Sequence, residues 1–479
     1  MVSPWEIEWF GMGFEVGTVI RRATNGFAAL ALVALFVSPA AAETIESALA
    51  RAYASNPELN AQRAQLRAID ENVPRALSGY RPRVTASGDL GVSNLDVTRG
   101  VGSAFSSMQN DSFWPRGAAL TIDQTLYNGN RTGNTVRRAD ASVLAGRASL
   151  RTSEQSTLTD GATVYMDVLR DTAFLNLRSA NIDVLNEQLR QTQDRFNVGE
   201  VTRTDVAQVE ARLAAGRSEW SLAEGNLKSS IARYRQVIGV EPKQLAPAKP
   251  LERLLPKTLD EAVRIAFGDH PAIIAAAHNV DVAQLDVKIV ESELYPSVGL
   301  QGSAQRRWDY QGSNVDLVQA QVVGRVNVPI YEGGETYARV RQAKETLGQR
   351  QLELDLARDR VRAAVVATWS QLEAAKARIQ AAESQIQAAT IALNGVREEA
   401  KVGQRTTLDV LITDQDLLSA RVNLVAAQRD RVVISYQVLA AMGRLSATTL
   451  ALKVDQYNAT THYNQVRDKW IGLRTPGGR

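Results

Sequence analysis

The feature that most constrains the fold of this 479-residue chain is an internal repeat. The stretch NVGEVTRTDVAQVEARL runs from Asn197 to Leu213, and KVGQRTTLDVLITDQDL runs from Lys401 to Leu417, 204 positions further on. In both copies a Val-Gly pair and a short polar turn precede a helical run. Self-similarity of this kind indicates that the chain builds one supersecondary unit twice.

The repeat covers most of the chain. TIESALARAYASNPEL, from Thr44 to Leu59, matches TLDEAVRIAFGDHPAI, from Thr258 to Ile273, at an offset of 214. The later offset of 204 implies ten additional residues in the first copy. Four prolines between Glu241 and Pro256 indicate a non-helical connection. The predicted divisions are a signal peptide (1–42), a first repeat (43–240), a linker (241–257), a second repeat (258–443) and a C-terminal segment (444–479).

Each unit starts with a helix and then changes to a period of two. Between Pro82 and Val92 the apolar or small residues stand at even-numbered positions, and the alternation returns in three further segments, including Val318–Ile330. Alternation over about 8–13 residues predicts β-strands with one apolar face. Each unit is therefore expected to contribute one hairpin, at residues 82–127 and 296–331.

Two long proline-free stretches follow the hairpins, from Gly129 to Val198 and from Gly333 to Val402. Apolar residues recur in the first at steps of three or four, which predicts a helix. Each stretch would make a rod of about 100 Å. Return helices are predicted over 202–237 and 406–441, so the turns at Gly199 and Gly403 are expected at one end and the hairpins at the other.

The N-terminus has the pattern of a secretory signal. Arg21-Arg22 precedes an apolar stretch from Phe27 to Val37, and Ala40-Ala41-Ala42 supplies a small-residue cleavage site. The apolar stretch is too short to span a bilayer as a helix. We expect cleavage after residue 42, a start at Met1 or Met12, and an exported mature chain without a transmembrane helix.

Composition excludes several classes of function. The 55 basic and 52 acidic residues are interspersed, so the basic patch of a nucleic-acid binder is missing. The chain has no cysteine, which excludes thiolate metal sites and a cysteine nucleophile. His270, His278 and His462 lack zinc-site spacing and are interpreted as surface or capping residues. We therefore predict no catalytic, cofactor-binding or metal-binding residues, no cofactor, and a protein that is not an enzyme.

The hairpins admit two interpretations, because four strands with one apolar face would also suit an ordinary soluble sheet. Aromatic residues mark both ends of the strands: Tyr80, Tyr127, Tyr295 and Tyr331 at the helix-side ends, and Phe113, Trp114, Trp308 and Tyr310 at the loop-side ends. Two aromatic belts around an alternating apolar band are typical of an outer-membrane barrel. A bilayer tolerates only closed sheets, so several chains would have to complete the barrel.

The chain resembles the outer-membrane efflux proteins of the TolC family. The resemblance covers nearly the whole mature chain. It rests on the duplicated helix–hairpin–long helix–turn–helix unit, on N-P-E-L at Asn56–Leu59, and on G-x-R-T-T-L-D-V-L at Gly403–Leu411. It implies a mainly α fold with a membrane β-barrel part. Three chains would form a twelve-stranded outer-membrane β-barrel that continues into a long α-helical barrel crossing the periplasm.

The resemblance also implies a function and partners. The homotrimer would be a channel for efflux or type I protein secretion, embedded in outer-membrane lipid. It would work with a periplasmic adaptor (membrane fusion) protein and an inner-membrane transporter of the ABC or RND type. Residues 241–257 and 444–479 would form an equatorial belt around the helices.

The resemblance further assigns a periplasmic gate to the two tip turns. The predicted gate residues are Thr204, Asp205, Arg405 and Asp409, beside the tip-turn glycines Gly199 and Gly403. Arg405 would bond Thr204 and Asp205 of a neighbouring chain. Asp409 from three chains would form a carboxylate ring that selects cations.

Helix capping is the alternative explanation of these residues. A Thr or Asp near a helix N-terminus satisfies free N–H groups and suits the helix dipole. Ala400 and Ile412 stand where the family pattern has an aromatic residue and a second ring carboxylate, which predicts a weaker constriction. For the whole chain, the alternative function is a periplasmic coiled-coil scaffold or adaptor without a membrane pore, although that would leave the aromatic-capped hairpins unexplained.

Overall fold

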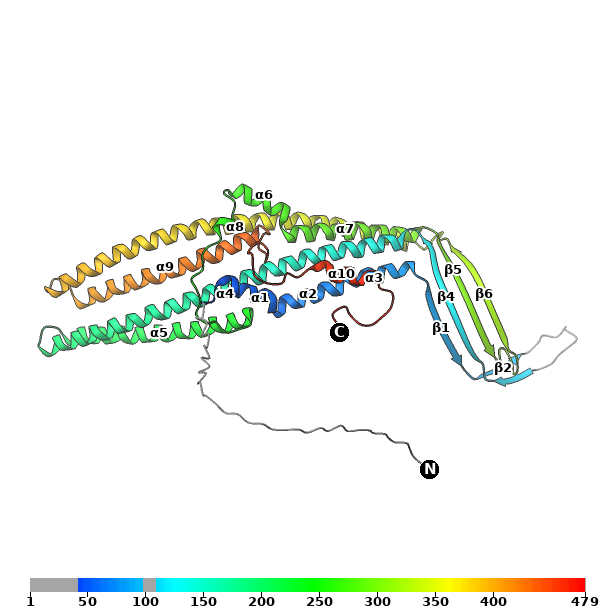
Figure 1. Cartoon of the computed structure of the whole chain (residues 1–479), viewed down its shortest axis with the longest axis horizontal. Helices are drawn as coiled ribbons and strands as arrows, with labels where there is room; N and C mark the ends of the chain where they lie inside the picture. Colours follow the sequence, from blue (N-terminus) through cyan, green and yellow to red (C-terminus); the bar gives the residue numbers. More distant parts are fainter. Residues whose placement is uncertain (1–41, 98–108, 479) are drawn as a thin grey trace, which may run out of the picture. The chain divides into compact units, whose positions relative to one another are not determined.

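The computed structural model describes residues 42–97 and 109–478 (Figure 1). The predicted signal peptide lies outside these residues, apart from Ala42. The first half contains α1 (Ile45–Ser55), α2 (Pro57–Asp70), α3 (Asn72–Leu77), η1 (Ser78–Tyr80), β1 (Arg83–Leu90), β2 (Ser93–Val97), β3 (Gln109–Phe113), β4 (Arg116–Asn128), α4 (Arg131–Asn197) and α5 (Arg203–Ile238). The second half contains η2 (Glu252–Leu254), α6 (Leu259–Asp269), α7 (Pro271–Glu291), η3 (Ser292–Leu294), β5 (Ser297–Trp308), β6 (Leu317–Asn327), α8 (Glu335–Lys401), α9 (Thr407–Ala441) and α10 (Ala459–Val466).

Both halves begin with two helices separated by a capped break. The side-chain oxygen of Asn56 accepts from the N–H groups of Glu58 and Leu59, and Pro57 takes the first helical position. In the second half His270 is the cap, and its Nδ1 accepts from the N–H of Ala272 at 3.2 Å. Burial lowers the pKa of His270, which favours the neutral ring that an acceptor nitrogen requires. Both breaks thus follow from an N-cap before a proline.

The longest elements are α4 and α8, with 67 residues each. α4 packs along α5 and α8 packs along α9, and α7 packs against both α4 and α8 (Figure 1). α1, α2 and α3 pack along α4. Gly161 shows how closely α1 approaches α4, because a Cβ at this position would lie 2.7 Å from Leu49 Cδ2.

The main hydrophobic core joins both halves at the middle of the long helices. It includes buried residues of α1, α4, α5, α6, α8 and α9. Tyr165, Tyr234 and Tyr436 are its largest fully buried side chains. The Tyr165 hydroxyl lies 2.7 Å from the carbonyl oxygens of Glu43 and Ala246. The core therefore attaches the segment between the two halves to α4.

The sheet has the strand order β1-β4-β5-β6, and all three pairings are antiparallel. Even-numbered residues face one side along matched rows, for example Ala86, Leu120, Ala304 and Ala320. β2 and β3 form a separate antiparallel pair between β1 and β4. The sequence did not predict this second hairpin, which extends the connection inside residues 82–127.

The predicted strand ending near Ile330 was wrong at its C-terminal end. β6 ends at Asn327, so Val328 and Ile330 lie beyond it. Pro329 is the second residue after the strand, and a proline has no N–H to donate to the ladder. Similarly, Val92 lies beyond the end of β1 at Leu90. The alternation of apolar residues thus continues past the last hydrogen-bonded residue of both strands.

The C-terminal segment contains a helix that the sequence did not predict. α10 packs on α2, where His462 Nδ1 lies 3.0 Å from the buried Asp70. The Tyr463 hydroxyl of α10 also donates to Asp140 of α4. Beyond α10, the Arg81 guanidinium stacks on Trp470, 4.4 Å from the ring centre. The segment therefore extends along α2 to the start of β1. Among the described residues, no helix has both the length and the apolar character needed to cross a membrane.

Candidate functional site

The two predicted tip turns have the same backbone geometry. Gly199 and Gly403 have φ values of 80° and 79°, in the left-handed region that favours glycine. In the first turn the N–H of Gly199 donates to Phe196 O and that of Glu200 donates to Arg195 O. Gly403 and the residue after it make the equivalent bonds. Each glycine thus ends a long helix and reverses the chain, as in a helix C-cap.

Each return helix then begins with a capping box. The Thr202 hydroxyl accepts from the N–H of Asp205, and the Asp205 carboxylate accepts from the N–H of Thr202 at 2.9 Å. In the second copy Thr406 and Asp409 make the same pair of bonds, at 3.2 and 3.0 Å. Both aspartates therefore take part in helix capping, as the capping explanation predicted.

Sequence reasoning missed one member of this arrangement. It named Thr204, which is exposed on the first turn of α5, whereas the N-cap is Thr202. The sequence did contain a signal for Thr202 as the N-cap, because the 204-residue offset of the repeat makes Thr202 correspond to Thr406. Thr204 corresponds instead to Leu408.

Capping also fixes the charge state of Asp409. The backbone and side-chain hydrogen bonds from Thr406 lower the pKa of this carboxyl group below its ordinary value of 3.8. A carboxylate that accepts such bonds is favoured in its ionised form. The carboxyl group of Asp409, beside the turn, is thus ionised at neutral pH.

Arg405 has a partner within its own chain. Its Nε donates to Glu399 Oε2 at 2.9 Å, across the turn from α8. The predicted bonds from Arg405 to Thr204 and Asp205 of a neighbouring chain concern a contact between chains, so they stay a prediction. Glu399 was not identified from the sequence, although it lies six positions before Arg405 in the same turn.

Below the turns, the two helix pairs contact each other. Leu411 of α9 packs with Leu185 of α4 and with Val209 and Leu213 of α5. Asp414, one turn further along α9, forms an ion pair with Arg397 of α8 at 3.2 Å. Burial raises the pKa of Asp414. The two helix pairs are therefore in contact through Leu411, whereas Ile412, the next residue of α9, remains exposed.

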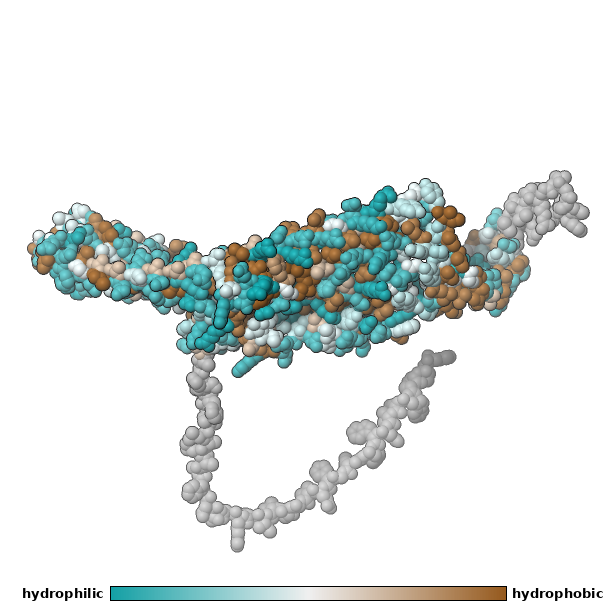
Figure 2. Space-filling view, turned by 90° about the horizontal axis from the view of Figure 1, so that it is seen from above, coloured by the Kyte–Doolittle hydropathy of each residue, from teal (hydrophilic) through white to brown (hydrophobic). Residues whose placement is uncertain are grey.

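The second candidate surface is the even-numbered face of the sheet. Figure 2 shows hydrophobic atoms gathered where the strands lie. The exposed large apolar residues of this face are Val84, Leu90, Leu120, Ile122, Leu300, Val318, Val322 and Val326. Water-soluble proteins rarely leave so extended an apolar surface open. This face therefore indicates contact with an apolar phase or partner.

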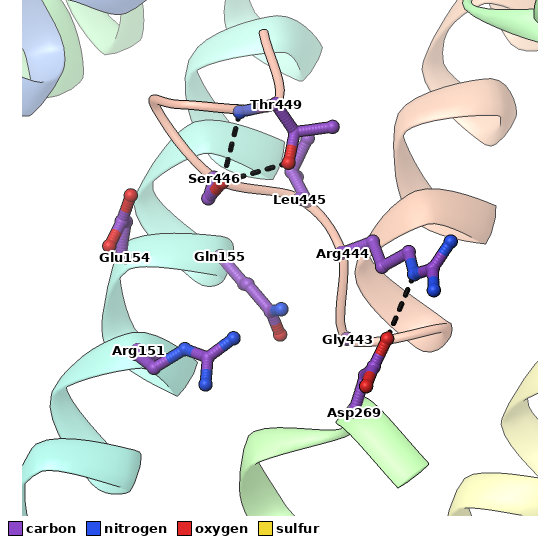
Figure 3. A pocket seen from close by; sticks show the side chains of 9 residues that line it. All are labelled: Arg151, Glu154, Gln155, Asp269, Gly443, Arg444, Leu445, Ser446 and Thr449. Carbon is purple, nitrogen blue, oxygen red and sulfur yellow. Dashed lines mark hydrogen bonds and ion pairs between the residues drawn. The ribbon is translucent and has the colours of Figure 1, made fainter. Parts of the chain in front are cut away.

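A polar pocket of about 440 Å³ lies where α4 meets the end of α6 and the segment after α9 (Figure 3). Arg444 forms an ion pair with Asp269 at 2.9 Å, and the Glu154 carboxylate accepts from the N–H of Ala447. Burial raises the pKa of Glu154. The bond from Ala447 to Glu154 joins the segment after α9 to α4 of the first half, and the Arg444 ion pair joins the same segment to α6, so the pocket is explained as a structural joint. Across residues 42–97 and 109–478, no cluster of three His, Asp or Glu side chains is placed to hold a metal ion.

The paired long helices, the repeated tip turns and the apolar strand face together define a class of protein. The sequence profile of the outer membrane efflux protein family matches residues 48–240 and 263–444, so the chain belongs to that family. It is 41% identical to the outer membrane efflux protein BepC of Brucella suis biovar 1 (strain 1330) over 92% of this chain and 94% of BepC. It is 24% identical to the outer membrane protein TolC of Escherichia coli (strain K12) over 87% of this chain and 85% of TolC.

The fold is also similar to those of solved outer-membrane channels. The Campylobacter jejuni CmeC outer membrane channel matches with a TM-score of 0.74 at 14% identity, over 88% of this chain and 89% of CmeC. The outer membrane protein VceC of Vibrio cholerae matches with a TM-score of 0.70 at 18% identity, over 83% of this chain and 96% of VceC. The chain is thus an outer membrane efflux protein with the fold of these channels, and its family comprises transport channels rather than enzymes.

Proposed function

We propose that this protein is a trimeric outer-membrane channel that exports substrates from the periplasm to the outside. The observation that carries the proposal is the four-stranded sheet with its exposed apolar face. β1 and β6 each have a single neighbour in the sheet that the described residues form. In lipid, each unsatisfied backbone group costs several kcal/mol, so an inserted sheet must close. Three chains with four strands each would close a twelve-stranded barrel.

The helices extend the same reasoning to the periplasm. In this proposal the two halves are tandem repeats, 43–240 and 258–443, released from a signal peptide at 1–42. α4 with α5 and α8 with α9 would line a helical barrel below the membrane. The segments 241–257 and 444–479 would surround it as an equatorial belt. Each half has short helices first, then strands, then a long helix and a return helix, and this shared order supports the division.

The tip turns would form the gate. Asp409 from three chains would provide a ring of negative charge, and Arg405 would hold the closed arrangement against a neighbour's Thr204 and Asp205. A periplasmic adaptor and an inner-membrane transporter of the ABC or RND type would dock at this end and supply energy. The relative named "Alkaline protease secretion protein AprF" of Pseudomonas aeruginosa, 26% identical over 73% of this chain and 74% of AprF, supports an export role of this kind.

Purified protein tests the proposal. Membranes that contain the full-length chain should release it only with detergent, light scattering should give the mass of three chains, and planar bilayers should show ion-conducting channels. A periplasmic scaffold or adaptor would be released without detergent and would give no conductance. A monomer without conductance in the bilayer would contradict the proposed channel.

A further inference from the structure

We propose that the apolar face of the sheet carries a binding site for a phosphorylated membrane lipid. Arg116, Arg306 and Trp308 would hold the phosphate-bearing headgroup, and an adjacent groove would take one acyl chain. The inference rests on the proposed function, because it requires that the even-numbered face of the sheet lies against lipid. It adds a defined ligand site to that face.

The strand register places the three headgroup residues on the apolar side. Arg116 of β4 pairs with Trp308 of β5, and in the next row of this face Ala118 pairs with Arg306, which in turn pairs with Val318 of β6. All five positions are even-numbered, and neighbouring rows on one face lie about 7 Å apart along a strand. Arg306 therefore stands beside exposed apolar residues at the loop-side end of the band.

The side chains form a cationic cluster around the tryptophan. The Arg306 guanidinium carbon lies 4.8 Å from the centre of the Trp308 ring, and that of Arg116 lies 6.0 Å from it. More than half of each arginine side chain is exposed, 57% and 55%. Stacking on the ring holds both guanidinium groups in place without using their N–H donors. Two fixed arginines at the end of an apolar surface suit a phosphate group.

The acidic neighbours leave these donors available. Asp316 lies 4.0 Å from Arg306, and Asp309 lies 3.8 Å from Arg116, measured between the nearest nitrogen and oxygen atoms. Charge-assisted hydrogen bonds are about 2.7–2.9 Å long. Both ion pairs are therefore too long to be such bonds, and a phosphate oxygen is able to approach more closely.

The groove begins one row away from Arg306. It has a volume of about 380 Å³, and its floor is formed by small residues between larger ones on either side. The lining residues on the even face are Leu120, Ile122, Gly302, Ala304, Ala320 and Val322. Leu120, Ala304 and Ala320 form one row, and Ile122, Gly302 and Val322 form the next. The groove thus lies next to the row of Arg306, on the side towards the middle of the apolar band.

A phosphorylated lipid fits both parts of the site at once. A free phosphate would use the arginines and leave the groove empty, and a purely apolar molecule would leave the arginines without a partner. Tryptophan is enriched where membranes meet water, which is the depth of a lipid headgroup. The site therefore selects a lipid of the leaflet at the loop-side end of the sheet, with its phosphate at Arg116 and Arg306.

The test uses the detergent-purified trimer, diphosphorylated lipid A as the probe, and native mass spectrometry to count bound lipid. The double variant Arg116→Gln/Arg306→Gln should lower the apparent affinity about tenfold, because it removes two charge-assisted contacts. Ala320→Phe should also lower it, by filling the groove without changing the charge. The matched control is Arg307→Gln/Arg325→Gln, which removes two arginines from the opposite, odd-numbered face and should bind lipid as the wild type does.

Conductance in planar bilayers separates this inference from the proposed channel. All variants should form trimers, and the even-face variants Arg116→Gln/Arg306→Gln and Ala320→Phe should conduct as the wild type does. Equal lipid binding by conducting wild type and Arg116→Gln/Arg306→Gln trimers would overturn the lipid site alone. An equal loss of lipid binding in the odd-face control Arg307→Gln/Arg325→Gln would show a general effect of charge and would also overturn the lipid site. Millimolar inorganic phosphate that displaces the lipid completely would assign the arginines to free phosphate instead. A wild type that neither assembles nor conducts would contradict the channel and the lipid site together.

Discussion

At the residue scale, the tip of the chain combines two roles in one pair of aspartates. Asp205 and Asp409 each complete a capping box with a threonine three positions earlier. This role is structural and needs only one chain. The proposed ring charge is a property of three chains, and it uses the same carboxylate of Asp409. Experiments with substitutions at these positions must therefore distinguish the loss of the helix cap from the loss of the ring charge.

Arg405→Ser should raise single-channel conductance without lowering the yield of trimers, because it removes the proposed bond to the neighbouring chain. Bilayer recordings and a hypersensitivity assay with bulky antibiotics measure this effect. Glu399→Gln is the matched variant, since Glu399 is the partner of Arg405 within the chain. A rise in both variants would assign the effect to the internal ion pair, and unchanged conductance in Arg405→Ser would reject the proposed bond between chains.

Asp409→Asn should weaken the block of current by multivalent cations, and Asp205→Asn, which alters the same cap in the first half, should leave the block unchanged. In the wild type the block should persist as the pH falls through the ordinary aspartate range. The folded-state pKa of Asp409 is lowered, so its charge and its capping contribution are lost only as the pH falls through that lowered value. Block that is already half lost near pH 5 would contradict this assignment.

The residue types at the tip turns could be predicted from the sequence, whereas their hydrogen-bond and ion-pair partners could not. The repeated Val-Gly turn, followed by Thr and Asp residues at a helix N-terminus, was sufficient to predict capping as an alternative explanation. Thr202 was missed because Thr204 stands closer to Asp205 in the sequence, although only Thr202 occupies the N-cap. Glu399 was missed because its pairing depends on how the turn folds back on α8. Contacts across a turn need the backbone path, which residue spacing alone does not supply.

At the element scale, periodicity predicted strands and helices wherever one face is consistently apolar. It did not predict the ends of β1 and β6, because the apolar alternation continues beyond the hydrogen-bonded ladder. Val326 lies well inside the alternating segment Val318–Ile330, yet it is the second-last residue of β6. β2, β3 and α10 lack a long apolar period, so their formation depends on pairing or packing with other segments.

The register of β6 makes a sharper prediction with two neighbouring valines. Val322 is 74% exposed on the even face and Val323 is 37% exposed on the odd face. Val322→Arg should destabilise the inserted protein by about 2–4 kcal/mol if it lies at the bilayer midplane, whereas Val323→Arg should be tolerated in a wet lumen. The yield of heat-resistant trimers in outer membranes measures the difference. Equal yields would show that the assignment of the two faces is wrong.

At the scale of the whole molecule, the account depends on how three chains close the sheet. Along the order β1-β4-β5-β6 the strands alternate in direction, so β6 of one chain would meet β1 of the next as an antiparallel partner. Closure would also bring the tip turns of the three chains together around one axis. The gate, the lumen and the lipid-facing site all follow from this arrangement.

Engineered disulfides across the proposed β1–β6 boundary test this claim most directly, because the natural chain has no cysteine. Ala86→Cys on β1 would be combined, one at a time, with a cysteine at positions 318, 320, 322, 324 and 326 of β6, all on the same face. After oxidation in intact outer membranes, a non-reducing gel should show a covalent trimer for one of these pairs, and each single-cysteine control should run as a monomer. Monomers for every pair, or a ladder that continues beyond three chains, would contradict a closed trimer.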